Sequence, residues 1–99
     1  MGYLIGIDLG TSATKTVLFD ESLREVCSVS REYPMAQPKN GWAEQNPEDW
    51  WTAAWQTVKE ALAKSGIDPA QVKGVGIAGQ MHGMTLMDEK GRVLRPAII

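Results

Sequence analysis

The feature that most constrains the fold is a pair of short apolar runs joined by a small polar turn near the N-terminus. The first run covers residues 3–7 and stops at the carboxylate of Asp8, and the second covers residues 16–19. The turn between them is rich in Gly, Thr and Ser and is followed by Lys15. Two such runs joined in this way predict a β-hairpin with strands over residues 3–8 and 14–20.

The hairpin turn has the chemistry of an anion site. A turn of this kind leaves backbone N–H groups unpaired and pointing outward, which makes a concave site for anions. Thr11 and Ser12 add hydroxyl donors, and Lys15 adds a cation. Asp8 fits the same site if a divalent cation is present, because a carboxylate near phosphates usually holds Mg²⁺ directly or through its water shell. The pattern therefore predicts a site for a nucleotide polyphosphate with its metal.

Composition narrows the class of protein. The 99 residues are 43% hydrophobic and 22% charged, which is enough for one small domain. A net charge of -2 gives no reason to expect nucleic acid or a membrane as a partner. The single cysteine, Cys27, excludes an internal disulfide and fits a reducing cytosol. Asp8 interrupts the first apolar run too early for a signal peptide, so we expect a cytoplasmic protein.

Three strands and a loop are predicted before the first helix. Residues 24–33 form a third strand candidate, and the short turns between the three candidates favour an antiparallel meander. Residues 34–46 carry Pro34, Pro38 and Gly41, which indicate a loop. Trp42 lies in this loop, so it is the tryptophan that best fits a ligand contact.

One helix is predicted to begin at residue 47. Asn46 suits the N-cap and Pro47 the first helical position, while Gly66 suits the C-cap. An apolar stripe with the spacing i, i+4, i+7, i+11 consists of Trp51, Trp55, Val58 and Leu62. This spacing predicts one buried face, so we expect Trp51 and Trp55 in the core.

The segment after the helix predicts more strands. Candidates are residues 73–79, 84–88 and 92–95, with a turn at 80–83, and Met84 and Met87 are expected to pack within their strand. A helix before residues 73–79 allows this strand to lie parallel to the first, which gives a mixed sheet with a helix on one face. Gly74, Gly76 and Gly79 match a dinucleotide fingerprint only in spacing, because no helix follows them. They indicate instead a close approach of a neighbouring backbone or ligand.

Residues 80–83 are a second candidate for ligand contact. Ligands of open α/β sheets bind beyond the carboxyl ends of the strands. If the first strand and the strand over 73–79 are parallel, residues 9–13 and 80–83 share one crevice. Gln80 and His82 then lie where they can bind a hydroxylated substrate beside the phosphates. A surface histidine without a ligand is the alternative reading of His82.

Four segments carry resemblances to known families. Residues 6–12 followed by Lys15 resemble the first phosphate motif of the actin-like ATPase superfamily, which includes sugar kinases, actin and 70-kDa heat-shock chaperones. Residues 41–51 are similar to the FGGY carbohydrate kinases. Residues 76–83 and 93–98 resemble the ketopentose kinases of that family, whose substrate is D-xylulose.

The resemblance implies a fold and a set of roles. The fold is an α/β, actin-like ATPase (ribonuclease H-like) domain with a mixed sheet, and residues 1–99 are the N-terminal part of the first FGGY kinase domain. Asp8 acts on the Mg²⁺–ATP complex. The phosphate contacts implied are Gly10, Thr11, Ser12 and Lys15. The ketopentose contacts are Met81 and His82, beside Gln80, and the product is D-xylulose 5-phosphate.

The same resemblance indicates that the chain is incomplete. The general base and the adenine-binding segment of this family lie further along than residue 99, and the chain ends on apolar residues. We therefore expect a fragment that is catalytically silent alone, because phosphoryl transfer needs donor, acceptor and base together. Such a fragment exposes apolar surface, so self-association, for instance as a homodimer, is expected.

Three alternatives stay open at this point. One is an actin-like or chaperone-type ATPase, which has no small-molecule acceptor. A second is a non-enzymatic module that keeps only the fold, against which the intact Asp8 and phosphate turn argue. The third concerns the acceptor alone, since ribulose or gluconate would suit the same kind of site.

Overall fold

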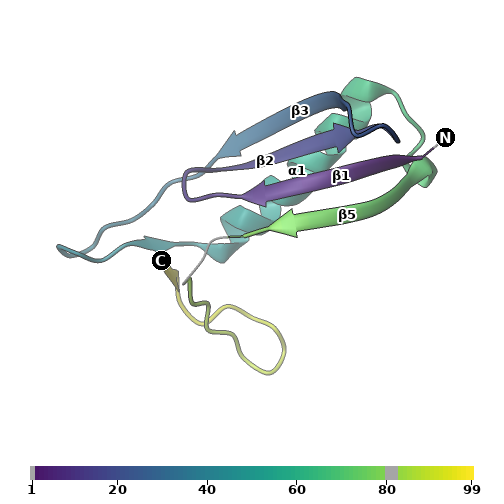
Figure 1. The fold of residues 1–99 in the computed structure, drawn as a ribbon. Helices are drawn as coiled ribbons and strands as arrows, with labels where there is room; N and C mark the ends of the chain where they lie inside the picture. Colours follow the sequence, from purple (N-terminus) through teal and green to yellow (C-terminus); the bar gives the residue numbers. More distant parts are fainter. Residues whose placement is uncertain (1, 80–82) are drawn as a thin grey trace.

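A computed structural model describes residues 2–79 and 83–99. Its elements are β1 (Tyr3–Leu9), β2 (Ala13–Phe19), β3 (Glu25–Glu32), β4 (Glu44–Gln45), α1 (Pro47–Ser65), the 3-10 helix η1 (Pro69–Gln71), β5 (Val72–Ala78) and β6 (Ala97–Ile98). Figure 1 shows β1, β2, β3 and β5 side by side in one layer with α1 across one face. The short strands β4 and β6 pair with each other beyond the end of this layer.

The larger sheet is mixed, as the sequence predicted. Its strand order is β3-β2-β1-β5. β1 and β3 each pair antiparallel with β2, which confirms the meander, and β5 pairs parallel with β1. A parallel pair needs a crossover connection, and α1 supplies it. The carboxyl ends of β1 and β5 therefore meet at one edge of the sheet, where Asp8 lies opposite Ala78.

The core lies between the sheet and α1. Ile5 and Ile7 of β1 and Leu18 of β2 form a buried cluster on the helix side. Successive side chains of a strand point to opposite faces, so Asp8, next to Ile7, is exposed on the other face. The alternation that buries the core thus determines which face of the sheet carries the charged groups.

The buried face of α1 differs from the predicted stripe. Trp51 and Trp55 are 67% and 43% exposed, so their predicted place in the core is wrong. The buried residues are Ala53, Thr57 and Ala61, which lie one turn apart on a different face. Their small side chains allow the helix to pack close to the sheet, whereas two indoles would hold it away. The predicted caps are confirmed, because Asn46 accepts a bond from the Glu48 N–H and Gly66 has a φ of 71°.

The C-terminal segment forms less regular structure than predicted. Instead of strands over 84–88 and 92–95, the structure has isolated bridges that join Met84 to Ile98 and Met87 to Val93. Met84 and Met87 are 50% and 54% exposed, so the prediction that they pack within a strand is wrong. The segment lies beyond the large sheet, where no second layer covers it (Figure 1). Only residue 83 of the predicted turn over 80–83 falls within the described part.

Part of the sheet stays uncovered. α1 packs mainly against β2 and β3. Val75 and Ile77 of β5 are consequently 57% and 72% exposed, although their register partners Ile5 and Ile7 are buried. This is the apolar surface expected of a fragment, while self-association stays a prediction. No helix in the described part combines the length and the apolar character needed to cross a bilayer.

One buried hydroxyl pair joins α1 to the sheet and generates a stability prediction. Thr16 and Thr57 are both fully buried, and their Oγ1 atoms lie 2.7 Å apart. Thr57 also bonds the carbonyl of Ala53 at 2.8 Å. The carbonyl of Ala54 also lies 2.9 Å from this hydroxyl. Since carbonyls only accept, the Thr57 proton goes to these helix carbonyls, and Thr16 donates to Thr57.

We expect Thr57→Val to lower the free energy of unfolding by about 1–3 kcal/mol, because it leaves the Thr16 hydroxyl buried without its acceptor. The double variant that also carries Thr16→Val should lose less free energy of unfolding than Thr57→Val alone, since both polar groups are then removed. Urea denaturation of the two variants measures the difference. A double variant that loses as much free energy of unfolding as Thr57→Val, or more, would contradict the pairing.

A second prediction concerns the turn at residues 88–92. The Arg92 backbone N–H, its guanidinium and the Lys90 N–H all bond the carboxylate of Asp88 and hold its pKa below the usual range. When folding lowers the pKa of a carboxyl group, the ionised group stabilises the folded state at pH values above its unfolded pKa. This stabilisation is lost as the pH falls through the folded pKa. We expect the amide signals of Lys90 and Arg92 to titrate with a midpoint below the usual aspartate value of about 3.9.

An NMR titration measures this response, and Asp88→Asn serves as the control because it has no proton to gain in that range. A midpoint at or above that usual value would contradict the prediction.

Candidate functional site

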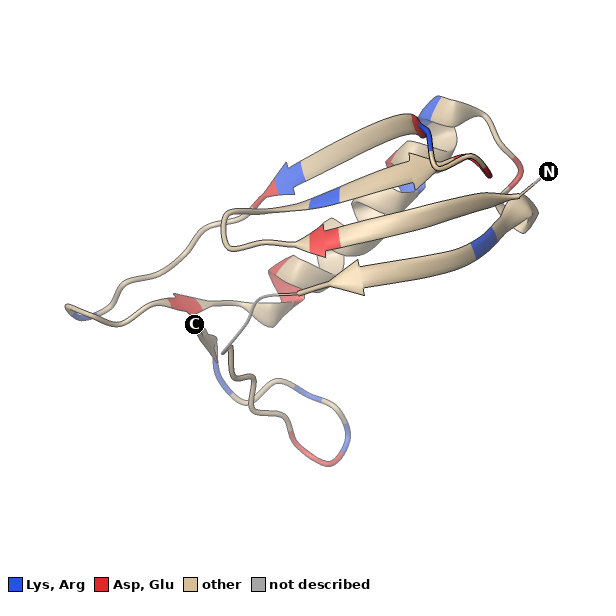
Figure 2. Cartoon of the chain, in the orientation of Figure 1, with Lys and Arg blue, Asp and Glu red and all other residues tan. Residues whose placement is uncertain are grey.

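Two opposite charges face each other across the first hairpin. Asp8 of β1 and Lys15 of β2 are register partners, so their side chains share the sheet face that is turned away from the core. Figure 2 shows an acidic band on β1 beside a basic band on β2, close to the edge where β1 and β5 end. Both side chains are exposed. The roles predicted for the two residues toward a nucleotide and its metal stay predictions.

The charges border a hollow of about 430 Å³ on the open face of the sheet. Its lining residues are Gly6, Ile7, Asp8, Lys15, Val17, Phe19, Gly76, Ile77 and Ala78. Gly6 and Gly76 are register partners, and a Cβ added to Gly76 would meet nothing within 4 Å. Bare backbone therefore forms part of the floor, as expected for a place that a ligand or a second backbone can approach closely.

The turn of the hairpin lies past the end of β1. The Gly10 N–H donates to the carbonyl of Ala13 at 2.9 Å, which closes the turn. A Cβ on Gly10 would lie 3.0 Å from that same oxygen, so a larger residue would force the turn open. Thr11 and Ser12 are exposed at its tip. The predicted polar turn is thus present, with its two hydroxyl residues at the surface.

The carbonyl oxygens of the turn are bonded by residues that sequence reasoning missed. The Tyr33 hydroxyl donates to Gly10, the Tyr33 N–H donates to Ser12 at 3.1 Å, and the Gln45 side-chain amide donates to Thr11. Tyr33 follows β3, and Gln45 lies in β4 just before the helix cap. A glutamine next to a helix start carries no signal of its own, and its 2% exposure is visible only in the structure.

The predicted sugar contacts cannot be compared with the structure. Gln80, Met81 and His82 lie outside the described residues, so their predicted roles stay predictions. What the structure describes is the strand that precedes them: β5 ends at Ala78, beside Asp8. The topological part of the expectation, two parallel strands whose carboxyl ends share an edge, is confirmed.

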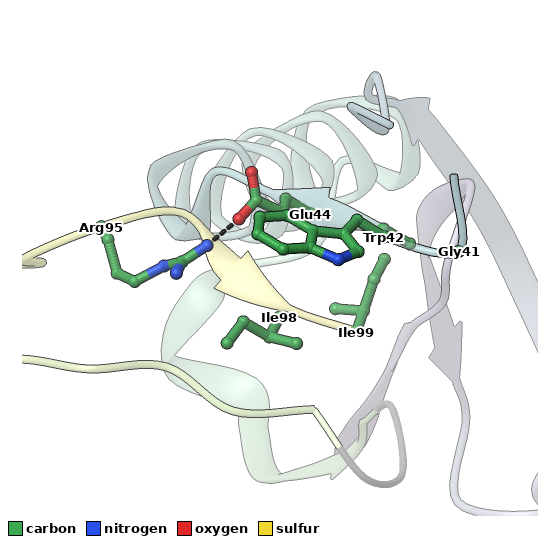
Figure 3. Close-up of a pocket in the computed structure, with 7 residues that line it drawn as sticks. Gly41, Trp42, Glu44, Arg95, Ile98 and Ile99 are labelled. Carbon is green, nitrogen blue, oxygen red and sulfur yellow. Dashed lines mark ion pairs between the residues drawn. The ribbon is translucent and has the colours of Figure 1, made fainter. Parts of the chain in front are cut away.

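A smaller cavity of about 170 Å³ lies at the β4–β6 pair (Figure 3). Trp42, Glu44, Arg95, Ile98 and Ile99 line it, and Glu44 forms an ion pair with Arg95. The Trp42 ring is half exposed, and the Lys39 ammonium lies 4.7 Å from its centroid, within cation–π distance. The ring therefore lies beside a cavity, and its predicted contact with a ligand stays a prediction.

A single carboxylate next to a phosphate turn suits one kind of metal. Among the described residues, no cluster of three or more His, Cys, Asp or Glu side chains could hold a metal ion. Mg²⁺ does not require such a cluster, because it keeps several waters and is bound through one or two carboxylates together with the phosphates of its substrate. Asp8 fits that pattern, whereas a structural zinc or a calcium site would need more ligands than it offers.

The sequence profile of the FGGY family of carbohydrate kinases, N-terminal domain, matches residues 3–99. The chain belongs to the FGGY family of carbohydrate kinases. It is 42% identical over 99 residues to the xylulose kinase of Bacillus subtilis, covering 100% of this chain and 20% of that protein. The chain thus spans about a fifth of the length of that relative. Family membership favours a sugar kinase over the actin-like and chaperone alternatives.

Solved structures of related kinases have the same fold. A ligand-bound xylulose kinase from Lactobacillus acidophilus matches with a TM-score of 0.90 and 34% identity, over 99% of this chain and 19% of that one. A gluconate kinase from the same organism also matches with a TM-score of 0.90 and 34% identity, over 98% and 19%. The expected actin-like ATPase fold is confirmed, and this chain spans about a fifth of the length of each of those kinases.

Proposed function

We propose that the complete kinase to which this FGGY chain contributes phosphorylates D-xylulose to D-xylulose 5-phosphate with Mg²⁺–ATP. By the complete kinase we mean residues 1–99, as the N-terminal part of the first FGGY domain, together with the rest of that domain and the second one. The observation that carries the proposal is the pairing of Asp8 with Lys15 beside the turn at residues 10–12. Family membership supports a sugar as the acceptor.

The proposed roles follow from the chemistry of the described groups. Thr11 and Ser12 donate hydrogen bonds from the exposed turn to phosphate oxygens, while Gly10 keeps the turn tight. Lys15 places a positive charge next to the same oxygens. Asp8 holds Mg²⁺ through its water shell. When bound, Mg²⁺ neutralises charge that develops on the transferred phosphoryl group.

The acceptor site is proposed next to the phosphate turn, at the edge of the sheet where β1 and β5 both end. Gln80, Met81 and His82 follow β5, which ends beside Asp8, so the acceptor hydroxyl would lie near the phosphates. Relatives named xylulose kinase favour D-xylulose over ribulose. Gluconate is the second candidate, because an equally similar structure is that of a gluconate kinase. The kcat/KM values of the complete kinase for these three compounds decide among them.

Residues 1–99 supply only part of this machinery. We propose that the general base and the adenine contacts come from the remainder of the complete kinase, which acts in the cytoplasm. Phosphoryl transfer needs the donor, the acceptor and the activating group in line. The isolated chain should consequently show no sustained phosphorylation of D-xylulose, and turnover by the isolated chain would refute this division.

The role of Asp8 gives the first kinetic prediction. In the complete kinase, Asp8→Asn should lower kcat by about 100-fold or more. The reason is that an uncharged amide holds Mg²⁺ less well than a carboxylate, and Mg²⁺ neutralises the charge that develops on the transferred phosphoryl group. The KM for D-xylulose should change little. A coupled assay of ADP release measures both constants. Glu25→Gln, which removes an exposed charge at the far end of the sheet, is the matched control; equal losses in both variants would contradict the role.

The role of His82 gives the second kinetic prediction. His82→Ala in the complete kinase should raise the KM for D-xylulose by about tenfold, since a lost hydrogen bond costs roughly 0.5–1.5 kcal/mol. The KM for ATP should stay within about twofold of the unaltered enzyme. Steady-state kinetics with each substrate varied in turn measure the split. An equal change for both substrates, or no change for either, would overturn the assignment of the sugar site.

A further inference from the structure

Three consecutive carbonyls of the hairpin turn are each bonded by a residue outside the turn. Gly10 accepts from the Tyr33 hydroxyl, Thr11 accepts from the Gln45 side chain, and Ser12 accepts from the Tyr33 backbone N–H at 3.1 Å. The donors come from the end of β3 and from β4, two segments that are separate in sequence. Three consecutive peptide groups of the turn are therefore oriented by residues outside it.

This orientation determines where the N–H groups of the turn point. A trans peptide is planar, with its C=O and N–H on opposite sides, and the described chain contains no cis peptide. The Thr11 N–H belongs to the peptide whose carbonyl Tyr33 bonds, and the Ser12 N–H to the peptide whose carbonyl Gln45 bonds. Each N–H consequently points away from the donor that bonds the carbonyl of its own peptide: the Thr11 N–H away from the Tyr33 hydroxyl, and the Ser12 N–H away from the Gln45 side chain.

The side-chain amide of Gln45 has only one workable orientation. The Trp50 indole N–H, which can only donate, bonds the Gln45 Oε1 at 2.9 Å. The opposite end of the amide, the NH₂ group, is then the end that faces the Thr11 carbonyl. Trp50 lies in the first turn of α1, so the start of the helix sets the direction of this bond.

The hydroxyl of Tyr33 is oriented in a similar way. Its one proton goes to the Gly10 carbonyl, which only accepts. The Thr14 hydroxyl, 3.2 Å from the Tyr33 oxygen, must then be the donor of that pair. Thr14 and Gln45 are at most 2% exposed and Tyr33 is 9% exposed. The network behind the turn is buried, and the hydroxyl protons of Tyr33 and Thr14 each have an assigned acceptor.

We propose that Tyr33 and Gln45 are positioning residues of the phosphate turn: they bond its carbonyls on one side and so present the N–H groups of Thr11 and Ser12 to the nucleotide phosphates on the other. The inference rests on the proposed nucleotide site. A carbonyl turned toward a phosphate would repel it, whereas N–H groups already aimed at it require no rearrangement when the nucleotide binds.

The test uses two variants of the complete kinase that remove one donor each. Tyr33→Phe removes the hydroxyl but keeps the backbone bond to Ser12, and Gln45→Met removes the amide at nearly constant size. Both should raise the KM for ATP and the Kd for Mg²⁺–ADP by about tenfold, and leave the KM for D-xylulose within about twofold. The matched controls Tyr3→Phe and Gln71→Met, which change residues at the opposite end of β1 from the turn, should change neither constant.

Each outcome separates the inference from the function on which it rests. Unaltered enzyme without measurable affinity for Mg²⁺–ADP in titration calorimetry overturns the proposed function, and the inference with it. Unaltered enzyme that binds, together with Tyr33→Phe and Gln45→Met variants that bind equally well, overturns the inference alone. So does an equal rise of the KM for both substrates, which marks a general loss of structure. If Gln45→Met fails to fold, Tyr33→Phe decides the question by itself.

Discussion

The parallel pairing of β1 with β5 is the constraint on which the rest of the structure depends. It requires a crossover, and α1 is that crossover. Packing α1 against the meander buries Ile5, Ile7 and Leu18, and the alternation of β1 then exposes Asp8 on the opposite face. The same pairing places the end of β5 beside Asp8. One strand pair thus accounts for the core and for the meeting of the two strand ends that precede the predicted ligand-binding segments.

The start of α1 links this core to the proposed phosphate turn. The helix packs closely because its buried residues are small, with Thr57 bonded to Thr16 of β2. Close packing places its first turn near the end of the sheet, where Trp50 orients Gln45 and Gln45 bonds Thr11. The turn itself has few atoms to hold it, so its conformation depends on the neighbours behind it. The packing of the helix against the sheet therefore also determines the conformation of the turn.

Local signals in the sequence predicted the elements well, and the packing of their faces less well. The hairpin, the meander and the caps of α1 depend on residues close in sequence, such as Asn46 before Pro47, and all are present. Trp51 and Trp55 follow helical spacing but are exposed, because spacing identifies a face and not what packs against it. The strands expected over 84–88 and 92–95 are reduced to bridges, since no layer covers that segment.

The sequence by itself determined the chemistry of the site: a carboxylate, hydroxyl groups and a lysine around a glycine turn, within a chain recognisable as an FGGY kinase. These are properties of neighbouring residues, which a linear pattern records. Only the tertiary structure decided that Tyr33 and Gln45 bond the carbonyls of that turn. They lie more than twenty residues beyond it along the chain, and hydrogen bonds between segments so far apart exist only once the sheet and the helix have formed.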